Sequence, residues 1–100
     1  MTGVFIVYTI NQMNYEFDLI KDESNMDKHG LSLAYAGGFE WETAMVHEDA
    51  RKQYAEPRFT ATGYIGDRLH VMVFCLRADA VRIIGLRKAN PREVKSYAET

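Results

Sequence analysis

The spacing of apolar positions changes along the chain and predicts a helical region near the N-terminus. After Asp18, which is a suitable N-cap, single apolar residues are interspersed with charged ones in the pattern of a surface helix. Gly30 follows, and glycine commonly ends a helix. Ser32 can cap a second, short helix, which Gly37 and Gly38 would end. The pattern therefore predicts a pair of helices.

The middle of the chain has the shorter period of β-strands. Turns at Gly66-Asp67 and Ala78-Asp79 separate three apolar runs, which predicts a meander of consecutive antiparallel strands. A shorter run before Pro57 is expected to join the same sheet as its fourth strand. The predicted strands are residues 43–47, 58–65, 69–77 and 80–87.

The last segment has the clearest helix signals. Asn90, Pro91 and Glu93 supply an N-cap, a proline at the first helical position and the partner residue of a capping box. Val94 and Tyr97 lie three apart and can share a face that packs on the sheet. Together the elements predict an α+β fold with two N-terminal helices, an antiparallel sheet of about four strands and a C-terminal helix.

The N-terminal residues have two interpretations. The apolar run at residues 4–10 is too short to span a membrane and lacks the basic leader of a signal peptide. It is either an edge strand or a product of translation from an upstream start codon, with Met13 as the true start. We favour the second, so the sequence predicts an extension at 1–12 and one domain at 13–100.

Composition places the chain among ordinary globular proteins, because 47% of its residues are hydrophobic and 26% are charged. Its one cysteine, Cys75, excludes an internal disulfide and fits a cytoplasmic protein. A net charge of −2 argues against a dedicated nucleic-acid binder. However, residues 77–100 carry six Lys/Arg against three Asp/Glu, while residues 1–76 carry six against eleven. A short polyanion is one explanation of this basic end, and ordinary solvated helix and strand ends are the other.

The candidate chemistry is metal-free. His29, His47 and His70 fall on different predicted elements, and no acidic cluster resembles a metal site, so no metal and no cofactor are expected. Cutting RNA without a metal needs a base for the 2′-hydroxyl, cations around the phosphate and an acid for the leaving oxygen.

Three arginines on the predicted strands are candidates for the phosphate contacts. Strand alternation places Arg77 on one face with Val71, Val73 and Cys75, and it places Arg87 with Val81, Ile83 and Gly85. Arg58 aligns with Thr60, Thr62 and Tyr64. If these faces coincide, the three guanidinium groups surround one phosphate-binding surface. Alternatively, arginines at strand ends simply extend into water.

Other candidates have equally ordinary alternatives. His29 could be a general acid or a phosphate ligand, or only a cap at its helix end. Lys28 is a cation of the kind expected in a last helical turn. Glu56 could act as a base near Arg58, or be a solvated loop carboxylate. Trp41 and Tyr54 could stack on a base or belong to the core.

Several motifs, in the same order, resemble the BrnT family of toxins. The family begins W-D-x-x-K-x-x-x-N-x-x-K-H-G-V-x-F-x-x-A, and this chain has F-D-x-x-K-x-x-x-N-x-x-K-H-G-L-x-L-x-x-A from Phe17. Ala55-Glu56-Pro57-Arg58 is similar to the family's G-E-x-R segment. The ending, R-I-I-G-L-R-K-A from Arg82 followed by Arg92-Glu93 and Tyr97, resembles R-I-I-S-A-R-K-A, R-x-E and Y. The match extends over residues 15–98.

The resemblance implies a RelE-like ribonuclease that arrests growth by cutting RNA. It also implies a BrnA-like antitoxin that forms a two-plus-two assembly with the toxin and makes the DNA contacts itself, with no membrane involved. Beginning at Met13 agrees with the family. The resemblance favours His29 as acid or phosphate ligand and the cations as a phosphate clamp. Catalytic candidates are Lys28, His29, Arg58, Arg87 and Lys88; RNA-binding candidates are Arg77, Arg82 and Glu56.

Four positions depart from the family pattern. Phe17 and Leu33 are apolar exchanges that packing should tolerate, and Ala55 replaces a glycine. Gly85-Leu86 replaces Ser-Ala and removes a hydroxyl next to Arg87. A catalytically degenerate protein-binding module is therefore the alternative to an active ribonuclease. Direct DNA binding is weaker, because no recognition-helix pattern occurs.

Overall fold

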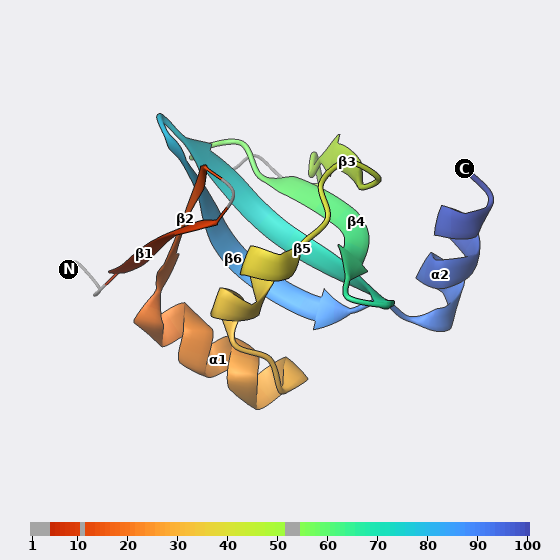
Figure 1. The fold of residues 1–100 in the computed structure, drawn as a ribbon, viewed down its shortest axis with the longest axis horizontal. Helices are drawn as coiled ribbons and strands as arrows, with labels where there is room; N and C mark the ends of the chain where they lie inside the picture. The colour runs from red at the N-terminus through yellow and green to blue at the C-terminus, as the bar shows by residue number, and fades with distance from the viewer. Residues whose placement is uncertain (1–4, 11, 52–54) are drawn as a thin grey trace.

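A computed structural model describes residues 5–10, 12–51 and 55–100. Strands dominate it, and two α-helices and a 3₁₀ segment accompany them (Figure 1). The elements in chain order are β1 (Phe5–Ile10), β2 (Met13–Asp18), α1 (Leu19–His29), η1 (Leu33–Gly38), β3 (Met45–Glu48), β4 (Phe59–Ile65), β5 (Arg68–Arg77), β6 (Ala80–Lys88) and α2 (Pro91–Ala98).

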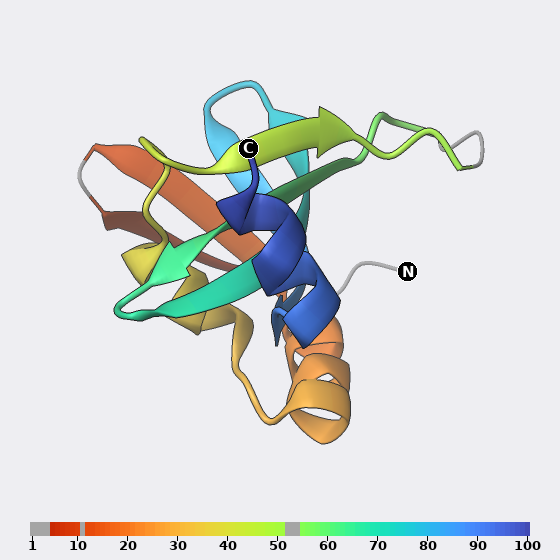
Figure 2. The same cartoon turned by 90° about the vertical axis from the view of Figure 1, so that its right-hand side faces the viewer.

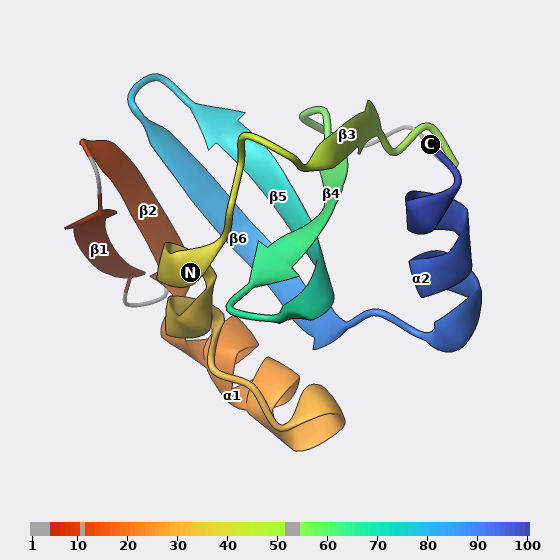
Figure 3. The same cartoon turned by 45° about the vertical axis from the view of Figure 1, so that its right-hand side comes forward.

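The strands form a single mixed sheet in the order β1-β2-β6-β5-β4-β3. Hairpins join β1 to β2, β4 to β5 and β5 to β6, and β3 pairs antiparallel with β4. The exception is β2, which runs parallel to β6 and pairs with it at only three positions, from Asn14 to Glu16. In Figure 3, α1 and η1 lie on the β2 side of the sheet and α2 stands beyond the last residue of β6.

The predicted fold class, with two N-terminal helices and about four antiparallel strands, is wrong. Residues 13–18 form a strand directly before the helix, and residues 5–10 pair with them as an edge strand. The segment after Ser32 is a 3₁₀ helix, because Gly37 and Gly38 follow too soon for an α-helix. The predicted meander is present, and the C-terminal helix begins at Pro91 with the expected capping box.

The main core lies between the sheet and η1, and α1 adds no apolar side chain to it. Its members include Tyr15 and Phe17 from β2, Leu33 from η1 and Met72 from β5, all nearly inaccessible to solvent. A smaller apolar cluster on the other face places Leu69, Val71 and Ala89 against Tyr64 and Tyr97. Within the described ranges, neither helix is long and apolar enough to cross a lipid bilayer.

A β-bulge in β6 changes which side chains share a face. Val73 is opposite Gly85, but Phe74 is opposite Ile83, so Ile84 is the extra residue. Beyond the bulge, Ile83 and Val81 point into the main core. The predicted alternation, which placed Arg87 with those two residues, is therefore wrong, and only Gly85 shares its face.

Candidate active site

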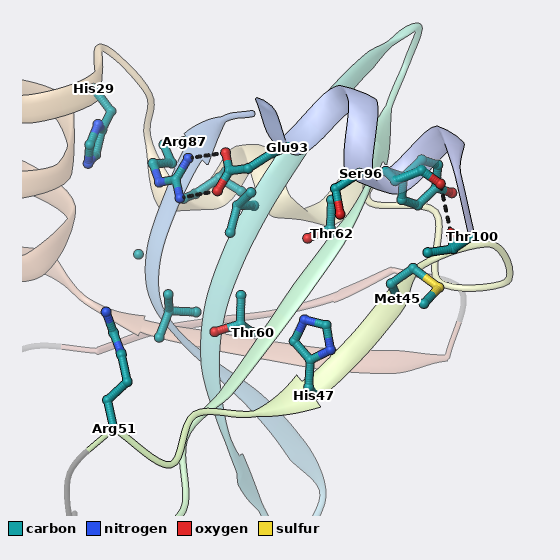
Figure 4. A pocket seen from close by; sticks show the side chains of 15 residues that line it. His29, Met45, His47, Arg51, Thr60, Thr62, Arg87, Glu93, Ser96 and Thr100 are labelled. Carbon is teal, nitrogen blue, oxygen red and sulfur yellow. Dashed lines mark hydrogen bonds and ion pairs between the residues drawn. The ribbon is translucent and has the colours of Figure 1, made fainter. Parts of the chain in front are cut away.

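The face of the sheet opposite η1 contains a cavity of about 500 Å³. Its floor is formed by side chains of β4, β5 and β6, and its walls by the end of α1, by β3 and by α2 (Figure 4). Figure 2 shows the end of α2 reaching β3 over this face. The cavity is lined by His29, Met45, His47, Arg51, Thr60, Thr62, Val71, Val73, Gly85, Leu86, Arg87, Glu93, Ser96, Tyr97 and Thr100.

A buried asparagine on α1 positions the His29 wall of the cavity. Where β2 ends, the backbone edge of β6 is taken over by Asn25, whose amide donates to the Leu86 carbonyl at 2.7 Å. Its carbonyl oxygen accepts from the Leu86 N–H at 3.0 Å. Gly30 then ends α1 in the left-handed conformation, with φ 70°. His29, one turn after Asn25, is thereby held beside Arg87, the residue that follows Leu86.

The guanidinium of Arg87 is bound by a carboxylate from α2. Both of its terminal nitrogens donate to the two oxygens of Glu93, each at 2.7 Å. These hydrogen bonds lower the pKa of the Glu93 carboxyl to about 2 and raise that of the Arg87 guanidinium. Glu93 also accepts from the Asn90 N–H in the capping box. Glu93 therefore occupies the position in which a phosphate could make the same bidentate contact.

The opposite wall comes from β3 and the segment after it. His47 is paired with Thr60 in the register of β3 and β4 and faces the cavity. Arg51 follows, and its guanidinium binds the buried carboxylate of Asp49 at 2.8 Å. Neither residue was predicted from the sequence to have a role in the site. A histidine in a short exposed strand gives no local signal, because only the strand pairing brings it to the cavity.

Of the predicted catalytic residues, His29 and Arg87 line the cavity and the others do not. Lys28 is exposed beside His29 in the last turn of α1. Arg58 lies just before β4, where its carbonyl accepts from the Asp49 N–H. Lys88 is opposite His70 in β5 and is therefore on the other face of the sheet from Arg87.

The predicted RNA-binding residues lie on the same face as the cavity but towards the other end of the strands. Arg77 at the end of β5 binds Glu56 at 2.9 Å. Arg82 binds Glu16 of β2 and stacks on the ring of Phe5. In this structure Glu56 is therefore the ion-pair partner of Arg77. The sequence had also allowed Glu56 to be a base near Arg58.

Several other residues considered in the sequence are buried or pack against the core. Trp41 packs against the main core and donates to the Tyr15 hydroxyl at 2.8 Å, so the core alternative is the correct one. Tyr54 lies outside the described residues. Cys75 is buried, and burial raises the pKa of its thiol, as expected for an inert cysteine. Phe17 and Leu33, the apolar departures, are both buried in the core.

Gly85 lies on the floor of the cavity beside Arg87. A Cβ atom at this position would meet only the Asn25 Oδ1 atom, at 3.8 Å, which is an ordinary contact. The Cβ atom of the family's serine would therefore fit here without rearrangement. Among the described residues, no group of three or more His, Cys, Asp or Glu side chains is arranged to hold a metal ion.

A family model matches most of the chain. The family is described as a ribonuclease toxin, BrnT, of a type II toxin–antitoxin system, and its model matches residues 17–93. This range includes both histidines of the cavity and the Arg87–Glu93 pair, whereas β1 precedes it. No curated protein matches the chain closely enough to count as a relative.

Proposed function

Because the chain belongs to the BrnT family of ribonuclease toxins of type II toxin–antitoxin systems, we propose that it cuts RNA in the cavity between α1, β3 and α2. The family predicted from the sequence is confirmed. The observation that supports this site is the convergence of His29 and Arg87, which come from distant parts of the chain, on one cavity. We expect the cleavage to need no metal ion.

Arg87 is the proposed phosphate ligand. Its guanidinium group already binds the Glu93 carboxylate through two parallel hydrogen bonds. Guanidinium groups bind phosphate oxygens with the same geometry. His29 is the proposed proton donor to the leaving oxygen. Lys28 is proposed to contact the RNA backbone near His29. Arg58 and Arg77 are proposed to contact it farther along the same face.

A type II toxin has an antitoxin partner. For this chain we propose a BrnA-like protein in a two-plus-two assembly, with all DNA contacts made by the antitoxin. One wall of the cavity is α2, which has no buried residue. An antitoxin that covered or moved α2 would control access to Arg87.

The test is RNA cleavage by the purified full chain, with Arg87→Ala and His29→Gln as variants. We expect each to slow cleavage by about 10²-fold or more, as is typical when a charge-stabilising or proton-transfer group is lost. The matched control is Arg92→Ala, an exposed arginine of α2 outside the cavity. Intact RNA with the wild-type chain, or Arg87→Ala cutting at the wild-type rate, would exclude this site.

A specific observation favours the alternative, a degenerate module that only binds protein. Four arginines of this face are each bound to a carboxylate: Arg51 to Asp49, Arg77 to Glu56, Arg82 to Glu16 and Arg87 to Glu93. Such pairs compete with RNA phosphates. Expression of the chain without any antitoxin separates the two functions, because only the ribonuclease would arrest growth with loss of RNA.

A further inference from the structure

The three histidines of the chain are not equivalent. His70 is buried on the core face, where its Nδ1–H donates to the Arg68 carbonyl at 2.8 Å and its ring contacts Tyr35. His29 and His47 are exposed and line the same cavity from opposite sides (Figure 4). Arg87 and Thr60 lie between them in this view.

We infer that His47 is a second catalytic residue, which takes the proton from the RNA 2′-hydroxyl while His29 gives one to the leaving oxygen. This inference rests on the proposed function and deepens it. It restricts the substrate to RNA with a free 2′-hydroxyl, and it gives the cavity a proton acceptor as well as a proton donor.

Strand pairing fixes the direction of the His47 side chain. In β3, alternate residues point to opposite faces, and Met45 and His47 are the two that line the cavity. The pairing of His47 with Thr60 and of Met45 with Thr62 places them over the floor formed by β4. Val46 and Glu48 consequently point away from the cavity.

Among the described residues, no contact gives His47 a structural role. It makes no hydrogen bond or ion pair with any other described residue, in contrast to His70. Both of its ring nitrogens are therefore available to a bound molecule. The charged groups that share the cavity with it are His29, Arg51, Arg87 and Glu93, and Glu48 is its neighbour on β3.

The proposed step balances without any further reactant. The neutral imidazole of His47 accepts the 2′-hydroxyl proton as the 2′-oxygen forms a bond to phosphorus. The bond between phosphorus and the 5′-oxygen breaks, and the imidazolium of His29 protonates that oxygen. The products are a 2′,3′-cyclic phosphate and a 5′-hydroxyl, and each histidine is left in the protonation state in which the other began.

The donor role falls to His29 because it is the last residue of α1, where the unpaired carbonyl groups attract a positive charge. His47 lies within strand β3 and not at a helix end. Arg87 would hold the phosphate between the two imidazole rings once phosphate oxygens had replaced the Glu93 carboxylate on its guanidinium group.

The experiment compares His47→Gln with Glu48→Gln, its neighbour on the outer side of β3. We expect His47→Gln to lower the cleavage rate by 10² to 10⁴-fold, the range typical of general acid–base catalysis, and Glu48→Gln to cut as the wild type does. Binding of a 2′-O-methyl RNA, which cannot be cut, should change less than threefold in both variants. The rate of the wild-type chain should fall on both sides of an optimal pH, and His47→Gln should lose the acidic limb.

Two results would overturn the inference. If the wild-type chain cuts RNA and His47→Gln retains its rate and its pH profile, His47 is not a proton-transfer group, although the proposed site stands. If His47→Gln weakens binding of the 2′-O-methyl RNA as much as it slows cleavage, His47 is only a binding residue. Loss of cleavage in the wild-type chain itself would remove the proposed function and this inference together.

Discussion

The two faces of the sheet are held by different kinds of contact. On the face covered by η1, large apolar side chains are buried, and at the edge of β6 the polar Asn25 of α1 has fixed partners in Leu86. On the opposite face, polar and charged side chains surround a cavity, and α2 is attached through the Arg87–Glu93 pair and Tyr97. The comparison suggests that the first face determines whether the chain folds and the second what it binds.

Replacing Asn25 should have the largest effect on the covered face. Asn25→Leu would leave both the N–H and the carbonyl of Leu86 without these partners at the buried edge of β6. Because an unsatisfied buried backbone group costs roughly 1–3 kcal/mol, we expect a loss of about 3 kcal/mol in the free energy of unfolding. Urea titration measures it. Ser24→Ala, an exposed neighbour on α1, is the control, and equal stabilities would refute the role of Asn25.

The second largest effect should be the response of the covered face to acid. Burial lowers the pKa of His70, and its Nε2 atom has no hydrogen-bond partner in the described part of the chain. In the unfolded chain the pKa of this histidine is about 6.5. Below that pH the unfolded chain therefore binds more protons than the folded chain. Stability should therefore fall as the pH drops from 7 towards 5.

His70→Asn can keep a donor for the Arg68 carbonyl but cannot titrate, so its stability should depend less on pH over the same interval. His29→Gln removes a histidine from the open face and serves as the comparison, since it should retain the wild-type dependence. Denaturant midpoints at a series of pH values measure both. An unchanged slope in His70→Asn would mean that other groups cause the acid sensitivity.

Local patterns predicted the elements of the fold better than their arrangement. The caps at Asp18, Gly30 and Asn90 are local hydrogen-bonding motifs, and each is where the sequence placed it. The parallel pairing of β2 with β6 joins residues more than sixty positions apart, and nothing in either segment alone encodes it. The bulge at Ile84 is equally invisible in the alternation of apolar residues. Because of it, the face predicted for Ile83 was wrong.

The candidate site could be predicted only in part for the same reason. His29 and Arg87 were found through motifs that resemble the family pattern, and both line the cavity. His47 lines the cavity but was not predicted to, because it reaches the cavity only through the pairing of β3 with β4. Lys88, the other basic residue of the motif that contains Arg87, lies outside the cavity, since a residue adjacent to Arg87 on a strand points to the other face.

On the open face, removing one charge should change binding more than stability. Glu93→Gln keeps an acceptor for the Asn90 N–H and hence the capping box, but it removes the carboxylate that holds Arg87. We expect a loss of only about 0.5 kcal/mol, because the pair is partly exposed. RNA binding should tighten severalfold, since phosphate no longer competes with a carboxylate whose pKa is about 2. Fluorescence anisotropy with 2′-O-methyl RNA measures it, and weaker binding would show that Glu93 assists the site.

The smallest effect on stability is expected at Gly85, where the chain departs from its family. The added Cβ of Gly85→Ser would meet only Asn25 Oδ1 at 3.8 Å, so the change should alter stability by less than about 0.5 kcal/mol. Gly63→Ser is the opposite case, because its Cβ would lie 2.7 Å from the ring of Phe39, and it should destabilise the fold clearly. If Gly85→Ser also raises the cleavage rate, the missing hydroxyl limits the site; if the rate stays the same, the glycine is a neutral departure from the family pattern.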